Sequence, residues 1–470
     1  MPHDELIRRF QESGLTLKEL SRRVQAGAHD TTVATPRRIR DWFGGAQPRD
    51  AWLAEIVAEV LSDACGQVVT AEDLGLLHGS GWSTAEPWLT SPWTRACTVK
   101  LLNEHARSDL MQLLTRRHAL GATVVTGGAL TEPVQRWTTV KPDKIPIARG
   151  AIGSAQVERI KQVTTMFREA DFKFGGGLSR DAVVAQLHWA SSQLHGPFAN
   201  EQVGRQFFAA VADLAEHAGW MSFDAGLHGP AQRYFVLGLR VAKESEHRPL
   251  IADVASCLAL QMIYVGHPDD ALDLIQHAQH VSRDQASPLL QSMLKVVEAR
   301  AHAKLGHMNS TDRWRRIEAV RRCVTDAEDL FTDRSLHEVD PWLSESWLRY
   351  FDETELAGDT GNAWFDLAPF DGYAAQESEQ RLQRAVTGFG DDYARSRAFS
   401  TVKLATLRLT RGEPEEAGQI LTSVFHDMEQ MNSARVANDL HEFTGRAQRY
   451  RDVPEIQELT KRLSTFTKVA

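Results

Sequence analysis

The sequence predicts an all-α protein, and three observations support this fold class. Apolar residues recur at helical spacing over most of the chain, as they do from Ala51 to Leu61. Ser, Thr, Asp or Pro precedes many of these segments and Gly follows them, as at the starts and ends of helices. Patterns typical of strands are scarce, and the best one, at residues 122–128, is short.

The first clear helix signal is a capping box at Thr16, where Glu19 follows three residues later. This pattern predicts a helix that starts at Thr16. Leu17, Leu20 and Val24 then lie at positions i, i+3 and i+7, which places them on one buried face.

A second helix is predicted to begin after Thr35, which would act as the N-cap before Pro36 at the first helical position. It would end at Gly44 and Gly45. With its apolar residues turned inward, its polar side chains must point largely outward; these are Arg37, Arg38, Arg40 and Asp41.

A short helix with arginines clustered at its N-terminal end has the layout of a DNA recognition helix, whose first turn enters the major groove. Arginine can bind guanine through two hydrogen bonds or contact phosphates. We therefore predict a DNA interface in two parts. The first comprises Thr35, Arg37, Arg38, Arg40 and Asp41, and the second is a set of phosphate contacts on the preceding helix, namely Lys18, Arg22 and Arg23. In the alternative interpretation these are ordinary solvated helix faces, with the arginines paired to Asp41 and Asp30.

Further helices are expected from Asp50 to Leu61, with Gly66 as a stop, and after a cap at residues 70–73. We predict a first domain at residues 1–77, a connector rich in Trp, Pro and Gly at 78–150, and a helical array at 151–470.

The third zone contains an internal repeat, because a residue pair ending in Gly recurs at intervals of 40 residues. The pairs are Ala225-Gly226, Val265-Gly266 and Leu305-Gly306, and a similar turn follows at Arg411-Gly412. Each is expected to end a helix. One helical hairpin cannot bury its apolar faces alone, whereas stacked hairpins share a continuous core. The pattern resembles tetratricopeptide repeats, with a period nearer 40 than the standard 34.

Several segments together resemble a known family of actinobacterial transcriptional regulators, which join a Cro/repressor-type helix-turn-helix to a tetratricopeptide-like body. The matching segments include Leu17-Lys-Glu-Leu-Ser-Arg-Arg-Val24 and the stretches at 38–48, 69–75, 167–177, 218–221, 232–235 and 450–454. The resemblance implies a regulator, often a repressor, of development or secondary metabolism. One departure is the turn from Gln25 to Ala34, which has about ten residues where the standard motif has three or four.

Composition restricts the other possibilities. The chain has 53 Lys and Arg against 62 Asp and Glu, a net charge of −9, which excludes a uniformly basic nucleic-acid coat but not a small basic reading head. The four cysteines form no CxxC pair, and His267, His277 and His280 lack zinc spacing. We expect no catalytic site, cofactor or metal, no signal peptide and no membrane span, and therefore a cytoplasmic protein.

The sequence thus predicts a transcriptional regulator that reads a palindromic operator in double-stranded DNA as a homodimer. Its helical body would dimerise and sense a peptide or a small-molecule effector in the groove of the repeats. The alternative is a tetratricopeptide-type interaction scaffold whose helix-turn-helix head does not bind DNA, and the long turn at Gln25–Ala34 is its best support.

Overall fold

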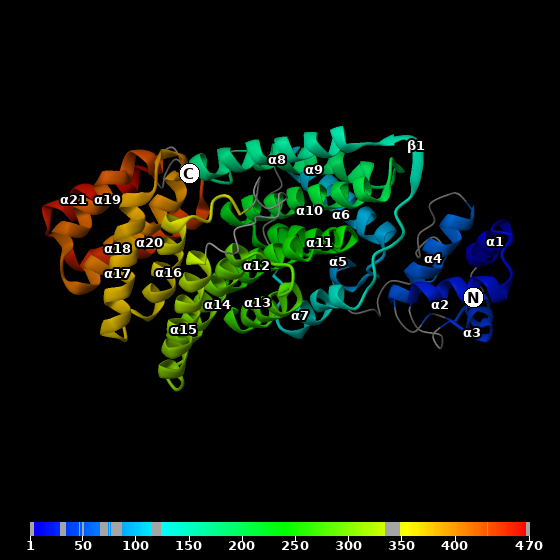
Figure 1. Cartoon of the computed structure of the whole chain (residues 1–470), viewed down its shortest axis with the longest axis horizontal. Coiled ribbons are helices and arrows are strands. Elements are labelled where there is room, and N and C mark those ends of the chain that lie inside the picture. Colours follow the sequence, from blue (N-terminus) through cyan, green and yellow to red (C-terminus); the bar gives the residue numbers. More distant parts are fainter. Residues whose placement is uncertain are drawn as a thin grey trace. The chain divides into compact units, whose positions relative to one another are not determined.

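The computed structural model describes residues 4–28, 34–46, 48, 51–65, 74, 76, 87–114, 124–177, 179–333, 348–429 and 431–466. Over these ranges the protein is all-α, which confirms the predicted fold class (Figure 1). The strand-like run at 122–128 forms no strand in its described part. The one strand in the described ranges, β1 (Ile147–Ile152), makes isolated bridges to Phe198 and no sheet.

The chain divides into two compact units. The first comprises Met1–Leu101 with Val140–Asp143, and the second Leu102–Thr139 with Lys144–Ala470. Residues 78–150, expected to be a connector, contribute to both units and carry several helices. These are α5 (Pro87–Thr90), α6 (Arg95–Leu114), α7 (Gly128–Gln135) and the 3₁₀ turn η1 (Arg136–Thr138).

Four helices of the first unit surround one apolar core: α1 (Asp4–Glu12), α2 (Leu17–Ala28), α3 (Pro36–Phe43) and α4 (Ala51–Cys65). Leu20 from α2, Ile39 and Trp42 from α3, and Leu61 from α4 are all buried there. α2 contacts both α3 and α4. The apolar spacing that suggested these helices is therefore the spacing of their buried faces.

The predicted starts of α2 and α3 are confirmed. The hydroxyl oxygen of Thr16 accepts a hydrogen bond from the backbone N–H of Glu19 at 3.2 Å. Thr35 caps α3 in the same way, accepting from the N–H of Arg38 at 3.4 Å, and Pro36 occupies the first helical position. The cap expected at residues 70–73 lies outside the described residues.

The second unit continues with long helices. They are α8 (Ser154–Phe174), α9 (Arg180–Gln193), α10 (Glu201–Asp224), α11 (His228–Ser245), α12 (Arg248–Tyr264), α13 (Pro268–Ser282), α14 (Pro288–Met308), α15 (Arg313–Thr332), α16 (Glu353–Leu367), α17 (Gly372–Gly388), α18 (Ala394–Arg411), α19 (Pro414–Glu429), α20 (Ala434–Ala447) and α21 (Pro454–Phe466). Short 3₁₀ turns are η3 (Asp391–Tyr393) and η4 (Gln448–Tyr450).

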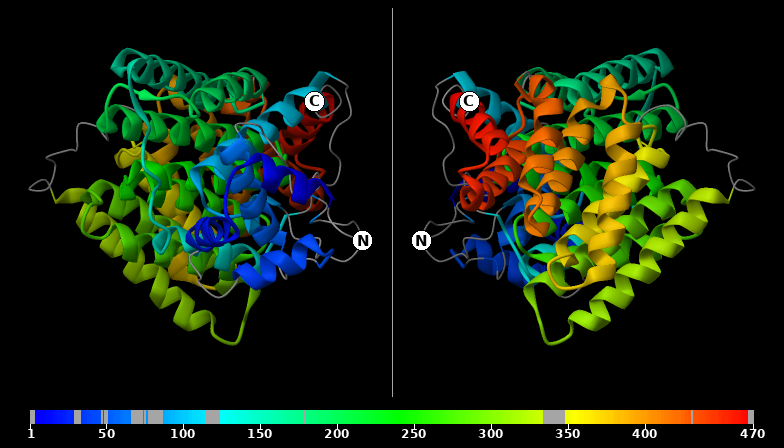
Figure 2. Two further views of the ribbon diagram at one scale, coloured as in Figure 1. Left: turned by 90° about the vertical axis from the view of Figure 1, so that its right-hand side faces the viewer. Right: turned by 90° about the vertical axis from the view of Figure 1, so that its left-hand side faces the viewer.

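From α10 to α19, sequence neighbours pack in pairs, which confirms the expected array of stacked helical hairpins. The first helices of successive pairs also contact each other, so α12 contacts α10 and α14, and α16 contacts α14 and α18. Figures 1 and 2 show the hairpin of α14 and α15, in yellow-green, as two adjacent helices joined by a tight loop. Each hairpin shares its buried face with the next.

Three of the four predicted glycine turns end a helix. Gly226, Gly266 and Gly412 follow α10, α12 and α18 with φ angles of 78°, 87° and 81°, in the left-handed region that glycine adopts most readily. Leu305-Gly306 was expected to end a helix as well, and this prediction is wrong, because α14 continues to Met308. Gly306 has a packing role instead: a Cβ there would lie 2.8 Å from Cδ2 of Leu367 on α16.

The late part of the chain returns to α8. Asn432 donates its backbone N–H to the carbonyl of Phe174 at 2.9 Å, and its own carbonyl accepts from Gly177 at 3.0 Å. α18 also contacts α8. Residues 175–177 therefore form a loop after α8, and they join parts of the second unit that are far apart in sequence. In the part of the chain that is described, no helix is both long and apolar enough to cross a membrane.

Candidate functional site

The predicted DNA-reading residues lie on the outer face of α3. Arg37, Arg38, Arg40 and Asp41 are all exposed, whereas Ile39 and Trp42 on the opposite face are fully or almost fully buried. The buried pair fixes the rotation of this two-turn helix, and the arginines therefore have to face solvent. The structure thus brings four predicted site residues together on one exposed surface.

Thr35 is half-buried, and its side chain is used as the cap of α3. Its role in this structure is to define where the helix begins. The helix N-terminus that it caps carries partial positive charge and lies beside the arginines.

The predicted phosphate contacts on α2 are exposed, but two of the three are paired. Glu19 accepts hydrogen bonds from Arg22 at 2.7 Å and from Arg23 at 3.0 Å, and these bonds lower the pKa of Glu19 to about 2. Lys18 is exposed as well. Exposed ion pairs of this kind contribute little and exchange partners at low cost.

In the alternative interpretation the arginines of α3 pair with Asp41 and Asp30. Two of the three make no such pair in the described part of the chain. Within the described ranges, Arg37 and Arg40 make no ion pair, and Asp30 lies outside those ranges. The turn expected from Gln25 to Ala34 is shorter than predicted, because α2 continues to Ala28. The turn is anchored at its end, since the buried hydroxyl of Ser21 donates to the carbonyl oxygen of Ala34 at 2.7 Å.

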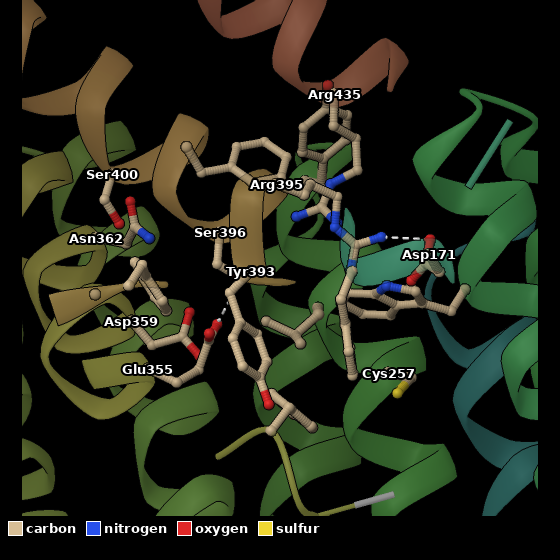
Figure 3. A pocket seen from close by; sticks show the side chains of 18 of the residues that line it. Asp171, Cys257, Glu355, Asp359, Asn362, Tyr393, Arg395, Ser396, Ser400 and Arg435 are labelled. Atoms are coloured by element: carbon tan, nitrogen blue, oxygen red, sulfur yellow. Dashed lines mark hydrogen bonds and ion pairs between the residues drawn. The ribbon is translucent and has the colours of Figure 1, made fainter. Parts of the chain in front are cut away.

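The second unit contains a cavity of about 140 Å³. The sequence predicted a ligand groove in the repeats but identified none of the residues that line this cavity. Residues from α8, α10, α12, α14, α16, α18 and α20 line it, together with Tyr350, Phe389 and Tyr393 (Figure 3). A second, adjoining cavity of about 380 Å³ shares Arg300, Lys403 and Arg435 with the first.

One wall of the first cavity is a network of buried ion pairs. Arg395 of α18 binds Asp171 of α8 at 2.5 Å and lies 3.8 Å from Asp224 of α10 (Figure 3). Arg168 of α8 binds Asp213 at 2.5 Å and Glu216 at 2.8 Å. These pairs join helices that are up to 224 residues apart in the sequence.

The opposite wall carries two carboxyl groups one helical turn apart on α16. Figure 3 shows Glu355 and Asp359 side by side. Asp359 binds Arg300 at 2.9 Å, whereas Glu355 receives a single long hydrogen bond, from Ser396 at 3.4 Å. Burial and the negative charge of Asp359 raise the pKa of Glu355 to about 8, against the opposing effects of Ser396 and Arg395.

A third carboxyl group, Asp253 of α12, lines the same cavity and is only 4% exposed. Among the described residues its side chain has no hydrogen-bond or ion-pair partner. Burial and the nearby charge of Glu216 raise its pKa well above the usual value. One helical turn further, the thiol of Cys257 donates to Glu216 at 3.3 Å, and burial raises the pKa of that thiol.

Aromatic rings complete the cavity. The ring of Phe172 lies 6.0 Å from that of Tyr350 and 5.4 Å from that of Tyr393, measured between centroids. Arg435 lies over four further rings, with its guanidinium carbon between 4.4 and 5.8 Å from the ring centroids of Trp220, Phe223, Tyr264 and Phe399.

A possible metal cluster in the second unit is a poor site. The ligand atoms of Glu298, His302 and Cys323 all lie within 4.8 Å of one another. However, Glu298 already accepts a hydrogen bond from Lys295 at 2.9 Å, and Arg316 contacts His302 at 3.1 Å. The positive charges of Lys295 and Arg316 beside the cluster would repel a metal ion.

Sequence reasoning found the face of α3 because caps and local spacing define it. It did not identify the residues of the cavity, because they come from seven α-helices and the segments between them, and no local pattern joins them. The one available signal was weak: charged residues such as Glu216 and Asp253 interrupt the apolar faces of α10 and α12.

A family model described as the SP15 N-terminal domain matches residues 6–77. The match falls within the first unit and spans nearly all of α1 to α4. No curated protein matches the chain. The family description names no activity, so functional inference depends on the residues themselves.

Proposed function

We propose that this protein is a sequence-specific DNA-binding transcriptional regulator. The observation that carries the proposal is the face of α3, where Arg37, Arg38 and Arg40 are exposed on a helix held in place by Ile39 and Trp42. Resemblance to actinobacterial regulators adds that the protein acts as a repressor of development or secondary metabolism.

In this proposal the N-terminal end of α3 enters the major groove. The side chains of Arg37, Arg38 and Arg40 contact guanine edges or phosphates, and Asp41 selects against bases that place an acceptor beside it. Arg22 and Arg23 exchange Glu19 for backbone phosphates on the adjacent strand, and Lys18 contacts a phosphate beside them.

The helical array acts as the dimerisation and sensing body. A homodimer would place two α3 helices about one DNA turn apart, roughly 34 Å, on a palindromic operator. Ligand binding to the array would change the spacing of the two heads and so couple the ligand to DNA affinity. The net charge of −9 disfavours non-specific DNA binding, so we expect affinity to depend strongly on the operator sequence.

The test is selection of fragmented host genomic DNA on the purified full-length protein. Wild type is expected to enrich a shared, palindromic motif. The variant Arg37→Ala/Arg38→Ala/Arg40→Ala is expected to lose that enrichment, and the salt dependence of its remaining DNA affinity should fall by about one counterion for each phosphate contact removed.

The matched control removes three exposed arginines from the helical body, Arg159→Ala/Arg384→Ala/Arg449→Ala, and so changes the net charge equally. It should enrich the same motif as wild type. If folded wild type enriches no motif, with or without cell extract as a source of effector, the proposal fails. In that case the alternative, an interaction scaffold with a head that does not bind DNA, becomes the better reading of the fold.

A further inference from the structure

We propose that the cavity of the helical array binds a small organic cation, an alkylammonium or guanidinium group on an apolar or aromatic body. The group would lie among Asp253, Glu355 and the rings of Tyr350, Tyr393 and Phe172. This inference specifies the effector of the proposed regulator, and only the effect on DNA binding rests on that function.

The first argument is charge balance. Seven buried or half-buried carboxyl groups belong to the cavity and the ion-pair network beside it: Asp171, Asp213, Glu216, Asp224, Asp253, Glu355 and Asp359. Four guanidinium groups face them: Arg168, Arg300, Arg395 and Arg435. Lys403 pairs with Asp439 at 3.3 Å and does not change the balance. An ionised carboxyl group that is buried without a partner is unfavourable, so the excess groups stay protonated unless a bound cation compensates their charge.

The second argument is that two carboxyl groups without an arginine partner among the described residues, Asp253 and Glu355, line the cavity. Arginines hold Asp213, Glu216 and Asp359. Asp253 is 4% exposed, faces the cavity and has no partner in the described structure. The Oε2 atom of Glu355 is likewise buried without a hydrogen-bond partner. Two acceptors are therefore available to a donor that enters the cavity.

The third argument is the aromatic lining. Tyr350 lines the cavity together with Asp253 and Glu355, and burial and these nearby acidic groups raise the pKa of its hydroxyl. The rings of Tyr350 and Tyr393 flank Phe172. Aromatic faces together with carboxylates are the usual surroundings of an organic cation.

Size restricts the ligand. A dry protein cavity of about 150 Å³ accommodates benzene, and this cavity measures about 140 Å³. It therefore admits a small amine, or one basic side chain of a peptide whose remainder occupies the adjoining cavity of about 380 Å³. A free amine and a peptide side chain present the same cationic group, and the experiment below distinguishes between them.

The experiment is titration calorimetry on the full-length protein at pH 7 with defined probes. Phenethylamine and agmatine represent free amines, the dipeptide Ala-Lys represents a peptide side chain, and 2-phenylethanol is the neutral control. At least one cationic probe is expected to bind at least about tenfold more tightly than 2-phenylethanol, which corresponds to roughly 1.4 kcal/mol. Equal binding of cationic and neutral probes, or no binding of any cation, would overturn the inference.

Two variants preserve the shape of the side chain and remove its ability to ionise. Asp253→Asn and Glu355→Gln are each expected to weaken cation binding at least about tenfold, since each removes a charge-assisted contact. Glu353→Gln is the matched control, because Glu353 is exposed on the same helix, and its affinity should equal that of wild type. Circular dichroism checks that each variant is folded. Unchanged affinity in both cavity variants would also overturn the inference.

A readout on wild type avoids any folding problem. Glu355 faces Asp352 and Asp359 on its own helix, Arg395 and Ser396 on α18, and the hydroxyls of Tyr350 and Tyr393. With its pKa near 8 it is mostly protonated at pH 7. A bound cation favours the carboxylate, so calorimetry in buffers of different ionisation enthalpy should detect release of up to about one proton per ligand from Glu355. Asp253, whose pKa is also raised, adds to this release, and Glu355→Gln should therefore release fewer protons than wild type. Binding without proton release would contradict the placement of the cation beside Glu355.

The two proposals fail independently. Cation binding without operator enrichment would retain the ligand site and reject the regulator. Operator enrichment without cation binding would retain the regulator and reject this ligand class.

Discussion

Single buried residues determine both candidate sites, but the property that matters differs between the two. On α3, Ile39 and Trp42 are buried, and their position alone decides that Arg37 and Arg40 face outward. In the cavity, the decisive property of Glu355 is what it lacks, because its Oε2 atom is buried without a hydrogen-bond partner. The first arrangement follows from helical periodicity, and the second only from packing.

The raised pKa of Glu355 predicts a pH dependence of stability. Its folded pKa of about 8 exceeds the ordinary value of 4.5. Between these values the unfolded chain loses this proton while the folded chain keeps it. The contribution of Glu355 to stability is therefore fully present below pH 4.5 and is lost as the pH rises toward 8.

Urea unfolding at pH 5, 6, 7 and 8 measures this effect. Wild type should become less stable across the range, and Glu355→Gln should show a smaller decrease, since its amide does not titrate. Part of the slope should remain, because burial also raises the pKa values of Asp171, Glu216 and Asp253. Identical slopes in the two proteins would show that Glu355 titrates normally.

At the scale of helices, glycines have two distinct roles in the array. Gly226, Gly266 and Gly412 end helices with positive φ. Gly306 lies inside α14, where it lets α14 approach α16 closely. Both roles appear as the same letter in a repeating pattern, and the sequence alone assigned all four glycines to helix ends.

Gly306→Ala tests the second role. In an open helix this change would stabilise by about 1 kcal/mol. Here the new Cβ would lie 2.8 Å from Leu367 and 3.0 Å from Cβ of Arg316, so we expect destabilisation of about 1–3 kcal/mol in urea unfolding. The control is Gly372→Ala at the start of α17, where nothing lies within 4 Å, and it should be neutral or slightly stabilising. A stabilised Gly306→Ala protein would mean that α14 and α16 separate freely.

At the scale of the whole second unit, buried ion pairs connect the first long helix to the last hairpins. Arg395 on α18 joins Asp171 on α8 and lies near Asp224 on α10, and all three side chains are almost completely buried. Loss of one partner leaves uncompensated charge in a poorly solvated place. These contacts hold α18 against α8 and α10.

Arg395→Met should therefore destabilise the protein by about 3–5 kcal/mol, as measured by urea unfolding at pH 7. Asp171→Asn in the same chain should recover part of this loss, because it removes one stranded carboxylate. Arg384→Met, at an exposed arginine of α17, should change stability by less than about 0.5 kcal/mol. A loss below about 1 kcal/mol for Arg395→Met would mean that α8 and α18 separate without unfolding the unit.

The sequence by itself determined the starts of helices, the fold class and the repeat of hairpins. Caps at Thr16 and Thr35 predicted the starts of two helices, apolar spacing predicted the all-α class, and the glycine interval predicted stacked hairpins. These features depend on residues within a few positions of one another, so one chain is enough to read them.

Only the tertiary structure decided which distant residues meet. It placed Asp171 against Arg395, gathered Asp253 and Glu355 around one cavity, and converted Gly306 from a helix end into a packing contact. The physical reason is that burial and ion pairing act between helices, at separations along the chain of as much as 224 residues. No local pattern encodes such contacts, because the residues that make them lie on helices far apart along the chain.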